Sequence, residues 1–88
     1  MKIKDGFALR NIAGCDIVVP LAKASDSFNG MITLNESAAF FWSLLKKDTT
    51  VDEMVASTLS EYEIDEATAR KDIEAFLATL RENNVLDE

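Results

Sequence analysis

The residues that decide the fold are 31–42, which read MITLNESAAFFW. The apolar run at 31–34 predicts a short strand, and Asn35 after it is a favourable helix N-cap. Beyond Asn35 the apolar residues recur at i, i+3, i+4 and i+7, the spacing of one face of a helix. This first helix should therefore bury one stripe, and one of Phe40 and Phe41 should be left over for a partner surface. The apolar stripe consists of Ala38, Phe41, Trp42 and Leu45.

Upstream of this segment, the sequence predicts a hairpin of two strands. Residues 7–12 carry an apolar alternation, and residues 16–19 are rich in β-branched side chains. Ala13-Gly14 between them is a turn signal, and Asn29-Gly30 is another one directly before residues 31–34. Three short strands are therefore expected before the first helix.

Downstream of this segment, two further helices are predicted. Residues 50–53 read TVDE, a capping box that begins the second helix. Asp65 is a suitable N-cap for a third helix over 66–83, in which Glu66 and Arg70 have the spacing of an ion pair. The apolar stripes are Val51, Met54, Val55, Leu59 and Tyr62 in the second helix and Ala69, Ile73, Phe76, Leu77 and Leu80 in the third.

The order of these elements predicts an α+β fold. Three strands are followed by three helices, an order typical of helices packed on one face of an antiparallel sheet. Val85 and Leu86 follow the third helix and are expected to fold back and close the core. A chain of 88 residues has the length of one domain, which we take as residues 1–88.

Composition argues against several classes of function. The net charge is −7, with nine basic and sixteen acidic residues, so nucleic acids and anionic membranes are unfavourable partners. The chain has no histidine and only three scattered glycines, which leaves no histidine-containing zinc motif and no phosphate-binding loop. We therefore expect a protein that is not an enzyme and that binds neither a metal nor a cofactor.

The single cysteine and the N-terminal sequence indicate the compartment. Cys15 has no second cysteine to pair with, so we expect a free, partly buried thiol in a reducing environment. Residues 1–6 lack the apolar core of a signal peptide, and no apolar run approaches the ~20 residues of a transmembrane helix. The chain is expected to be cytoplasmic.

Four segments together resemble the PqqD-like family, the precursor-peptide recognition elements. Residues 31–42 resemble its LNxxAAxxW segment, and residues 50–53 resemble the start of its second helix, TvxEi. Residues 62–65 resemble its Y-x-v-d connection, and residues 72–80 resemble its DvxxFlxxL helix. Each segment is short, but their order and spacing match the family over nearly the whole chain.

The resemblance implies a winged-helix-like domain that does not catalyse a reaction. Members of the family bind the leader segment of a ribosomally synthesised precursor peptide, which pairs with the third strand and lies in a groove against the third helix. They also dock on a radical S-adenosylmethionine enzyme, as in pyrroloquinoline quinone assembly, or on another modifying enzyme. The resemblance thus implies two partners for this chain, a leader peptide and a peptide-modifying enzyme.

The residues give this implied binding mode a physical basis. A strand at a sheet edge presents unpaired N–H and C=O groups to an incoming strand, and residues 31–34 are predicted to be that edge. Either Met31 and Thr33 or Ile32 and Leu34 should enter the core. On the third helix, the margin of the apolar stripe should touch the leader, and Arg70 and Lys71 either pair with leader carboxylates or remain solvated. The predicted peptide-binding residues are Met31, Ile32, Thr33, Leu34, Arg70, Lys71, Ile73, Phe76 and Leu77.

A second interpretation is a winged-helix adaptor or transcriptional regulator that contacts another protein. Binding to DNA is disfavoured because basic residues in 66–83 are offset by acidic ones, which leaves no strongly basic face. An exposed strand edge also permits a homodimer through strand pairing or strand exchange.

Overall fold

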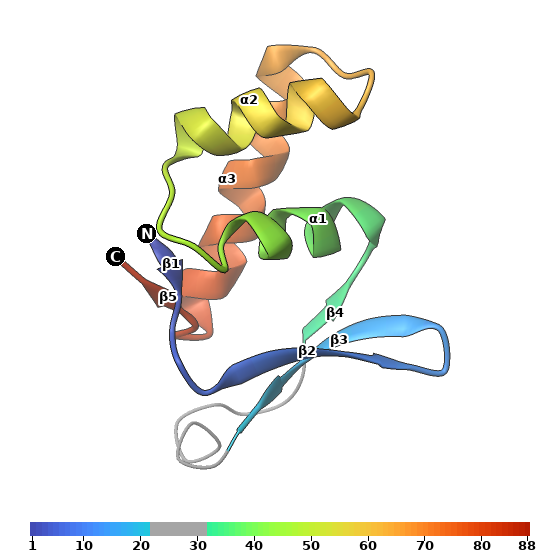
Figure 1. Ribbon diagram of the computed structural model, residues 1–88, viewed down its shortest axis with the longest axis vertical. Coiled ribbons are helices and arrows are strands. Elements are labelled where there is room, and N and C mark those ends of the chain that lie inside the picture. Colours follow the sequence, from blue (N-terminus) through green and yellow to red (C-terminus); the bar gives the residue numbers. More distant parts are fainter. Residues whose placement is uncertain (22–31) are drawn as a thin grey trace.

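The computed structural model describes residues 1–21 and 32–88 of the chain (Figure 1). Within them, a sheet of three antiparallel strands is followed by three helices, which confirms the predicted α+β fold. Met31 and the expected turn at Asn29-Gly30 lie outside the described residues. The elements are β1 (Lys2–Ile3), β2 (Phe7–Ile12), β3 (Cys15–Pro20), β4 (Ile32–Leu34), α1 (Glu36–Leu44), α2 (Val51–Glu61), α3 (Glu66–Glu82) and β5 (Leu86–Asp87).

The main sheet has the strand order β2-β3-β4, and both pairs of neighbours are antiparallel. A two-residue turn joins β2 to β3, and its Ala13 and Gly14 have φ angles of 53° and 82°. Positive φ at both positions is the type I′ geometry, which matches the twist of the flanking strands. Cys15 directly follows the turn and is exposed, so the expectation of a partly buried thiol was wrong.

Helix α1 begins where the sequence pattern changes. The side chain of Asn35 accepts a hydrogen bond from the N–H of Ala38 at 2.8 Å and caps the helix, as predicted. Phe40 is only half-buried, and its ring meets Tyr62 of the α2–α3 connection edge-on, with 5.4 Å between ring centroids. Phe40 is therefore the aromatic residue that the core leaves at its margin. The buried residues around α1 are Phe41, Trp42 and Leu45.

Helix α2 differs from the prediction at Thr58 and Leu59, and Tyr62 of the predicted stripe is the half-buried residue that caps its C-terminus. Thr58 is buried, and its hydroxyl donates to the carbonyl of Met54 at 2.8 Å, which satisfies the polar group within the helix. Leu59, predicted to belong to the stripe, is 38% exposed. Each residue turns the helix by about 100°, so Leu59 lies at the margin of a face centred on Val51, Val55 and Thr58.

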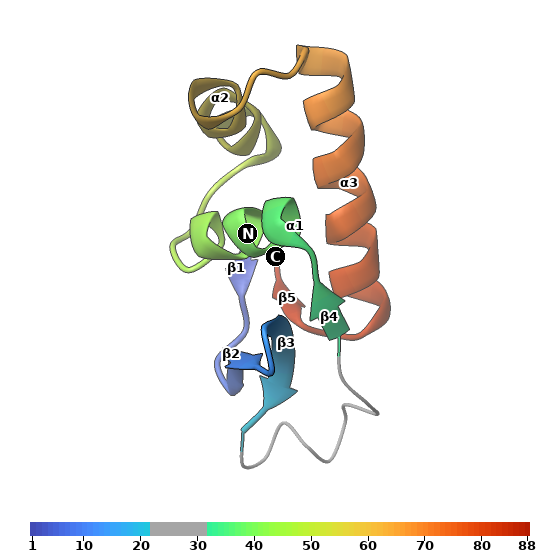
Figure 2. The same cartoon turned by 90° about the vertical axis from the view of Figure 1, so that its right-hand side faces the viewer.

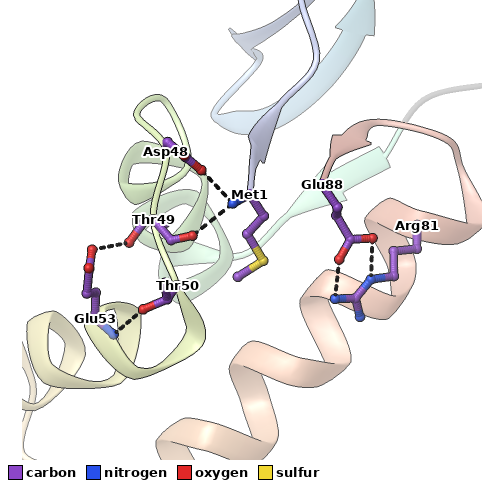
Figure 3. Close-up of polar contacts among 7 residues, drawn as sticks. All are labelled: Met1, Asp48, Thr49, Thr50, Glu53, Arg81 and Glu88. Carbon is purple, nitrogen blue, oxygen red and sulfur yellow. Dashed lines mark hydrogen bonds and ion pairs between the residues drawn. The ribbon is translucent and has the colours of Figure 1, made fainter.

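The capping box at the start of α2 forms in part (Figure 3). The hydroxyl of Thr50 accepts from the N–H of Glu53 at 3.2 Å, as predicted. The Glu53 carboxylate accepts from the hydroxyl of Thr49 at 3.1 Å, whereas a complete box would have it accept from the N–H of Thr50.

Helix α3 is the longest helix of the described chain and carries the predicted stripe. Asp65 caps it by accepting hydrogen bonds from the N–H and the hydroxyl of Thr68, at 3.1 and 2.7 Å. No helix among residues 1–21 and 32–88 has the length and apolar character needed to cross a membrane. The predicted stripe residues Ala69, Ile73, Phe76, Leu77 and Leu80 are all buried.

The two ends of the described chain pair with each other, a feature that the sequence analysis did not predict. β1 and β5 form a two-stranded antiparallel sheet, and Val85 and Leu86 are buried as expected. The α-ammonium of Met1 contacts the Asp48 carboxylate at 2.6 Å (Figure 3), and this contact lowers the pKa of that carboxyl group. Near the other end, Arg81 forms a bidentate pair with Glu88 at 3.0 and 2.8 Å.

We expect Leu77→Ala to destabilise the fold by roughly 2–5 kcal/mol, because it leaves a cavity in the core. Leu77 is fully buried on α3. The free energy of unfolding from urea titration is the measurement. Leu59→Ala is the matched control, since Leu59 is partly exposed and should lose far less. Equal losses for the two variants would contradict the described core.

We expect the Asp65 cap to make stability depend on acid pH. Hydrogen bonds from Thr68 lower the pKa of Asp65 below its usual value. A carboxyl whose pKa is lower in the folded chain stabilises folding above its unfolded pKa, and this contribution disappears as pH falls through the folded pKa. Urea midpoints of the wild type and Asp65→Asn should therefore converge on acidification. A difference that is constant from pH 7 to pH 2 would refute this role.

Candidate functional site

Strand β4 lies at one edge of the main sheet. Within the described chain it pairs with β3 on one side and has no strand on the other. Figure 2 shows β4 beside α3, while β2 forms the opposite edge of the sheet. Residues 32–34 therefore lie at a sheet edge, as expected. Which of their N–H and C=O groups point outward can be worked out from the pairing of β2 with β3.

The turn between β2 and β3 decides which backbone groups face which neighbour. In a two-residue hairpin, the residues that flank the turn exchange both N–H and C=O hydrogen bonds, so Ile12 and Cys15 form such a pair. Bonded and non-bonded pairs then alternate along the two strands. At the far end of the hairpin, the N–H of Leu21 donates to the carbonyl of Gly6 at 2.6 Å, which fits the same alternation.

The alternation carries over to β4. In β3, residues 15, 17 and 19 direct their backbone groups toward β2, so Asp16 and Val18 direct theirs toward β4. Their partners in β4 are Leu34 and Ile32. Thr33 lies between these partners, opposite residue 17, and its N–H and C=O consequently point away from β3, toward the open edge. Thr33 is thus the described residue of β4 placed to bond an added strand.

The side chains of β4 alternate as the pleat requires. Leu34 is buried at 6% exposure and Ile32 packs against the core, whereas Thr33 is exposed. The sequence left open which alternate pair of side chains enters the core, and the structure shows that it is Ile32 and Leu34. Met31 lies outside the described residues.

A hollow of about 240 Å³ begins where β4 ends. It lies between the start of α1 and the middle of α3. Its floor is apolar, with two aromatic rings whose centroids are 5.9 Å apart, and a carboxylate stands at its rim. The residues that line it are Asn35, Ser37, Ala38 and Phe41 on the α1 side and Asp72, Ala75 and Phe76 on α3.

The predicted apolar residues of α3 differ in access to this hollow. Ile73 and Leu77 are fully buried, so their side chains hold the core and offer no surface to a visiting chain. Phe76 is 8% exposed and lines the hollow. Asp72 and Ala75 line it too and were not singled out from the sequence. Asp72 precedes Ala75 by three residues and Phe76 by four, so it is the helical neighbour of both, on the side of α3 that adjoins the buried stripe.

The predicted basic residues of α3 do not line the hollow. Arg70 donates to the Asp52 carboxylate of α2 at 2.9 Å, and this hydrogen bond raises the pKa of Arg70. Glu66, expected to pair with Arg70, helps to raise the pKa of Arg70 through its charge, but the direct contact is with Asp52, which packing of α2 on α3 brings to the guanidinium. Lys71 is exposed. The charged group at the hollow is instead that of Asp72.

No metal centre is present among the described residues, where no group of three or more histidine, cysteine, aspartate or glutamate side chains is placed to hold an ion. Arg70 and Asp52 are exposed enough for solvent to weaken their attraction, so this ion pair is not a functional centre either. What remains as the candidate site is the open strand edge of β4 and the adjoining hollow with its apolar floor.

Solved structures similar to this chain support the same architecture. A structure of TbiB1 in complex with the TbiA(beta) leader peptide has a TM-score of 0.77 and 25% sequence identity, covering 99% of this chain and 95% of that one. A lasso peptide synthetase B1 complexed with the leader peptide has a TM-score of 0.73 and 19% identity, covering 96% and 93%. The second likeness is one of fold alone. No curated protein matches the chain.

A family model covers most of the sequence. Residues 17–86 match the model described as coenzyme PQQ synthesis protein D (PqqD). The matched region extends from β3 to β5 and includes β4, the hollow and all three helices. The resemblance noted in the sequence is thereby confirmed, and the chain belongs to the PqqD family.

Proposed function

We propose that this chain binds the leader segment of a ribosomally synthesised precursor peptide as an added strand on β4 and presents it to a modifying enzyme. The observation that carries the proposal is the outward direction of the Thr33 N–H and C=O groups, beside a hollow that begins at Asn35. β-Augmentation takes its affinity from such main-chain bonds and its specificity from neighbouring pockets.

The comparisons support this function. The TbiB1 structure, at 25% identity, contains a leader peptide and aligns with this chain over 99% of its length. Members of the PqqD family are non-catalytic peptide-binding proteins, in agreement with the expectation that the chain is not an enzyme.

In the proposed complex, the leader makes main-chain bonds with Thr33 and places one side chain in the hollow. Successive side chains of a strand point to opposite faces, so every second leader residue can reach it. The rings of Phe41 and Phe76 favour an apolar group, and the Asp72 carboxylate accepts a hydrogen bond at the rim. A leader side chain with an apolar body and a hydrogen-bond donor fits this combination.

We assign the leader contacts on α3 to Asp72, Ala75 and Phe76. They replace Arg70 and Lys71 in the set expected from the sequence, because neither basic residue lines the hollow. Ile73 and Leu77 support the site from within the core. Among the strand residues, Thr33 bonds the leader, and Ile32 and Leu34 hold the edge against β3.

The partner enzyme belongs to the proposal as well. A radical S-adenosylmethionine enzyme, or another peptide-modifying enzyme, would receive the leader from this domain. The competing interpretation as a DNA-binding regulator finds little support in α3. Arg70 and Arg81 are engaged in ion pairs, which leaves Lys71 as the remaining cation of that helix. One cation gives too little phosphate neutralisation for binding at physiological salt.

We expect Thr33→Pro to weaken leader binding by about two- to tenfold, the worth of one net hydrogen bond. Proline removes the outward N–H of residue 33 and leaves the bonds of Ile32 and Leu34 to β3 in place. Fluorescence anisotropy with a labelled leader peptide measures the affinity, and circular dichroism checks that the helices persist.

Asn11→Pro is the matched control for this variant. Asn11 faces residue 16 in a non-bonded pair, so its N–H points outward at the opposite edge of the sheet. This variant should bind the leader like the wild type. Unchanged affinity in Thr33→Pro, or an equal loss in both variants, would refute strand addition on β4.

The homodimer is tested by measuring the oligomeric state of the free protein over a series of concentrations. Pairing of two β4 edges in a dimer would compete with the leader for the same backbone groups.

We expect Ala75→Trp to reduce leader affinity at least tenfold, because the indole would fill the hollow beside Phe76. Ala75 is exposed, so the fold should tolerate the change. Isothermal titration with the leader peptide is the measurement. Ala78→Trp is the control, since Ala78 is also exposed on α3 but does not line the hollow. Loss of leader affinity in both variants, or in neither, would contradict the proposal that a leader side chain binds in the hollow.

A further inference from the structure

A second hollow, of about 370 Å³, lies along β2, the opposite edge of the sheet from β4. Residues 3–10 form one side of it, from the end of β1 through the first part of β2. Trp42 and Lys46, from α1 and the turn after it, form the other side. Nothing in the proposed leader site uses this hollow.

The hollow concentrates positive charge in an acidic protein. Lys4, Arg10 and Lys46 line it, against the single carboxylate of Asp5. Arg10 and Lys46 form no ion pair with another described residue, whereas the two other arginines, on α3, are both paired. Elsewhere in the described chain, over residues 51–88, acidic side chains outnumber basic ones. Lys4 donates to the side chain of Asn84 at 2.7 Å, so Arg10 and Lys46 are the cations available to an anionic partner.

The backbone at this edge is suited to an added strand. Leu9 and residue 18 of β3 form a non-bonded pair, by the same alternation that directs Thr33 outward at β4. The N–H and C=O of Leu9 consequently point away from β3, along the side on which the hollow lies. An extended chain bonded there would run past Arg10 and Lys46.

We propose that the outer edge of β2 docks an extended, acidic segment of a partner protein. Its main chain bonds the β2 edge at Leu9, its carboxylates meet Arg10 and Lys46, and an apolar side chain enters the hollow beside Trp42. A nucleic acid fits less well, because Trp42 is only 3% exposed and offers no ring face on which a base could stack. The overall charge of −7 also opposes it.

This docking is compatible with a leader on β4 at the same time. The two visiting strands would lie on opposite edges of a sheet of three strands. Four strand spacings of ~4.8 Å separate them, roughly 19 Å. The domain would then connect a peptide and a protein through one continuous sheet of five strands.

The probe for this edge is a capped heptapeptide of alternating glutamate and valine, titrated into the folded protein while amide shifts are followed by NMR. We expect the shifts to concentrate at residues 4–10 and at Lys46, with Thr33 and Leu34 unaffected. The dissociation constant should rise with added salt, because exposed charges are screened. Lys46→Glu should raise it at least tenfold.

The matched control is Lys71→Glu, an equal change of charge at another exposed lysine without an ion pair. It should change the dissociation constant less than twofold. The proposal is overturned if the acidic peptide does not bind, if its shifts fall on β4, or if both lysine variants lose affinity equally. It is also overturned if a lysine–valine heptapeptide or a thymidine octanucleotide binds this edge as well as the acidic peptide does.

Discussion

Alternation of backbone hydrogen bonds across the main sheet is the constraint on which the other features of this molecule depend. A two-residue turn at Ala13-Gly14 fixes which residues of β3 face β2. The remaining residues of β3 must then face β4, and the middle residue of β4 must face outward. A shift of β3 by one residue against β2, with the pairing of β3 and β4 unchanged, would reverse this alternation and direct the backbone groups of Ile32 and Leu34 to the open edge. The turn therefore influences a surface on the far side of the sheet, two strands away.

The long periodic segments of the fold could be predicted from the sequence. Every residue of the α3 stripe is buried, because seventeen helical residues repeat the pattern often enough to be unambiguous. β1 and β5 have two residues each, which is too short for any period to be visible. Leu59 was misplaced because it lies at the edge of its stripe, where packing of α2 decides exposure.

The candidate site could be predicted only in part. The strand edge was expected from the order of the elements, but which residue faces outward depends on the turn and on the register of two strand pairs. Arg70 was expected at the site because it is basic and lies on α3. Its partner Asp52 is 18 residues away in sequence, so only the packing of α2 against α3 reveals the pair. Asp72 and Ala75 belong to no apolar or charged pattern in the sequence. They line the hollow only because the start of α1 packs opposite them.

The pairing of β1 with β5 has a consequence for how such a domain can be built into larger assemblies. Lys2 and Asp87 are directly opposite each other, so the chain enters and leaves the domain at one place (Figure 1). Domains whose ends meet in this way tolerate insertion into a loop of another protein and circular permutation. Two connecting segments could depart side by side there without interrupting the three-stranded sheet. This architecture is therefore suited both to insertion into a larger enzyme and to existence as a separate polypeptide.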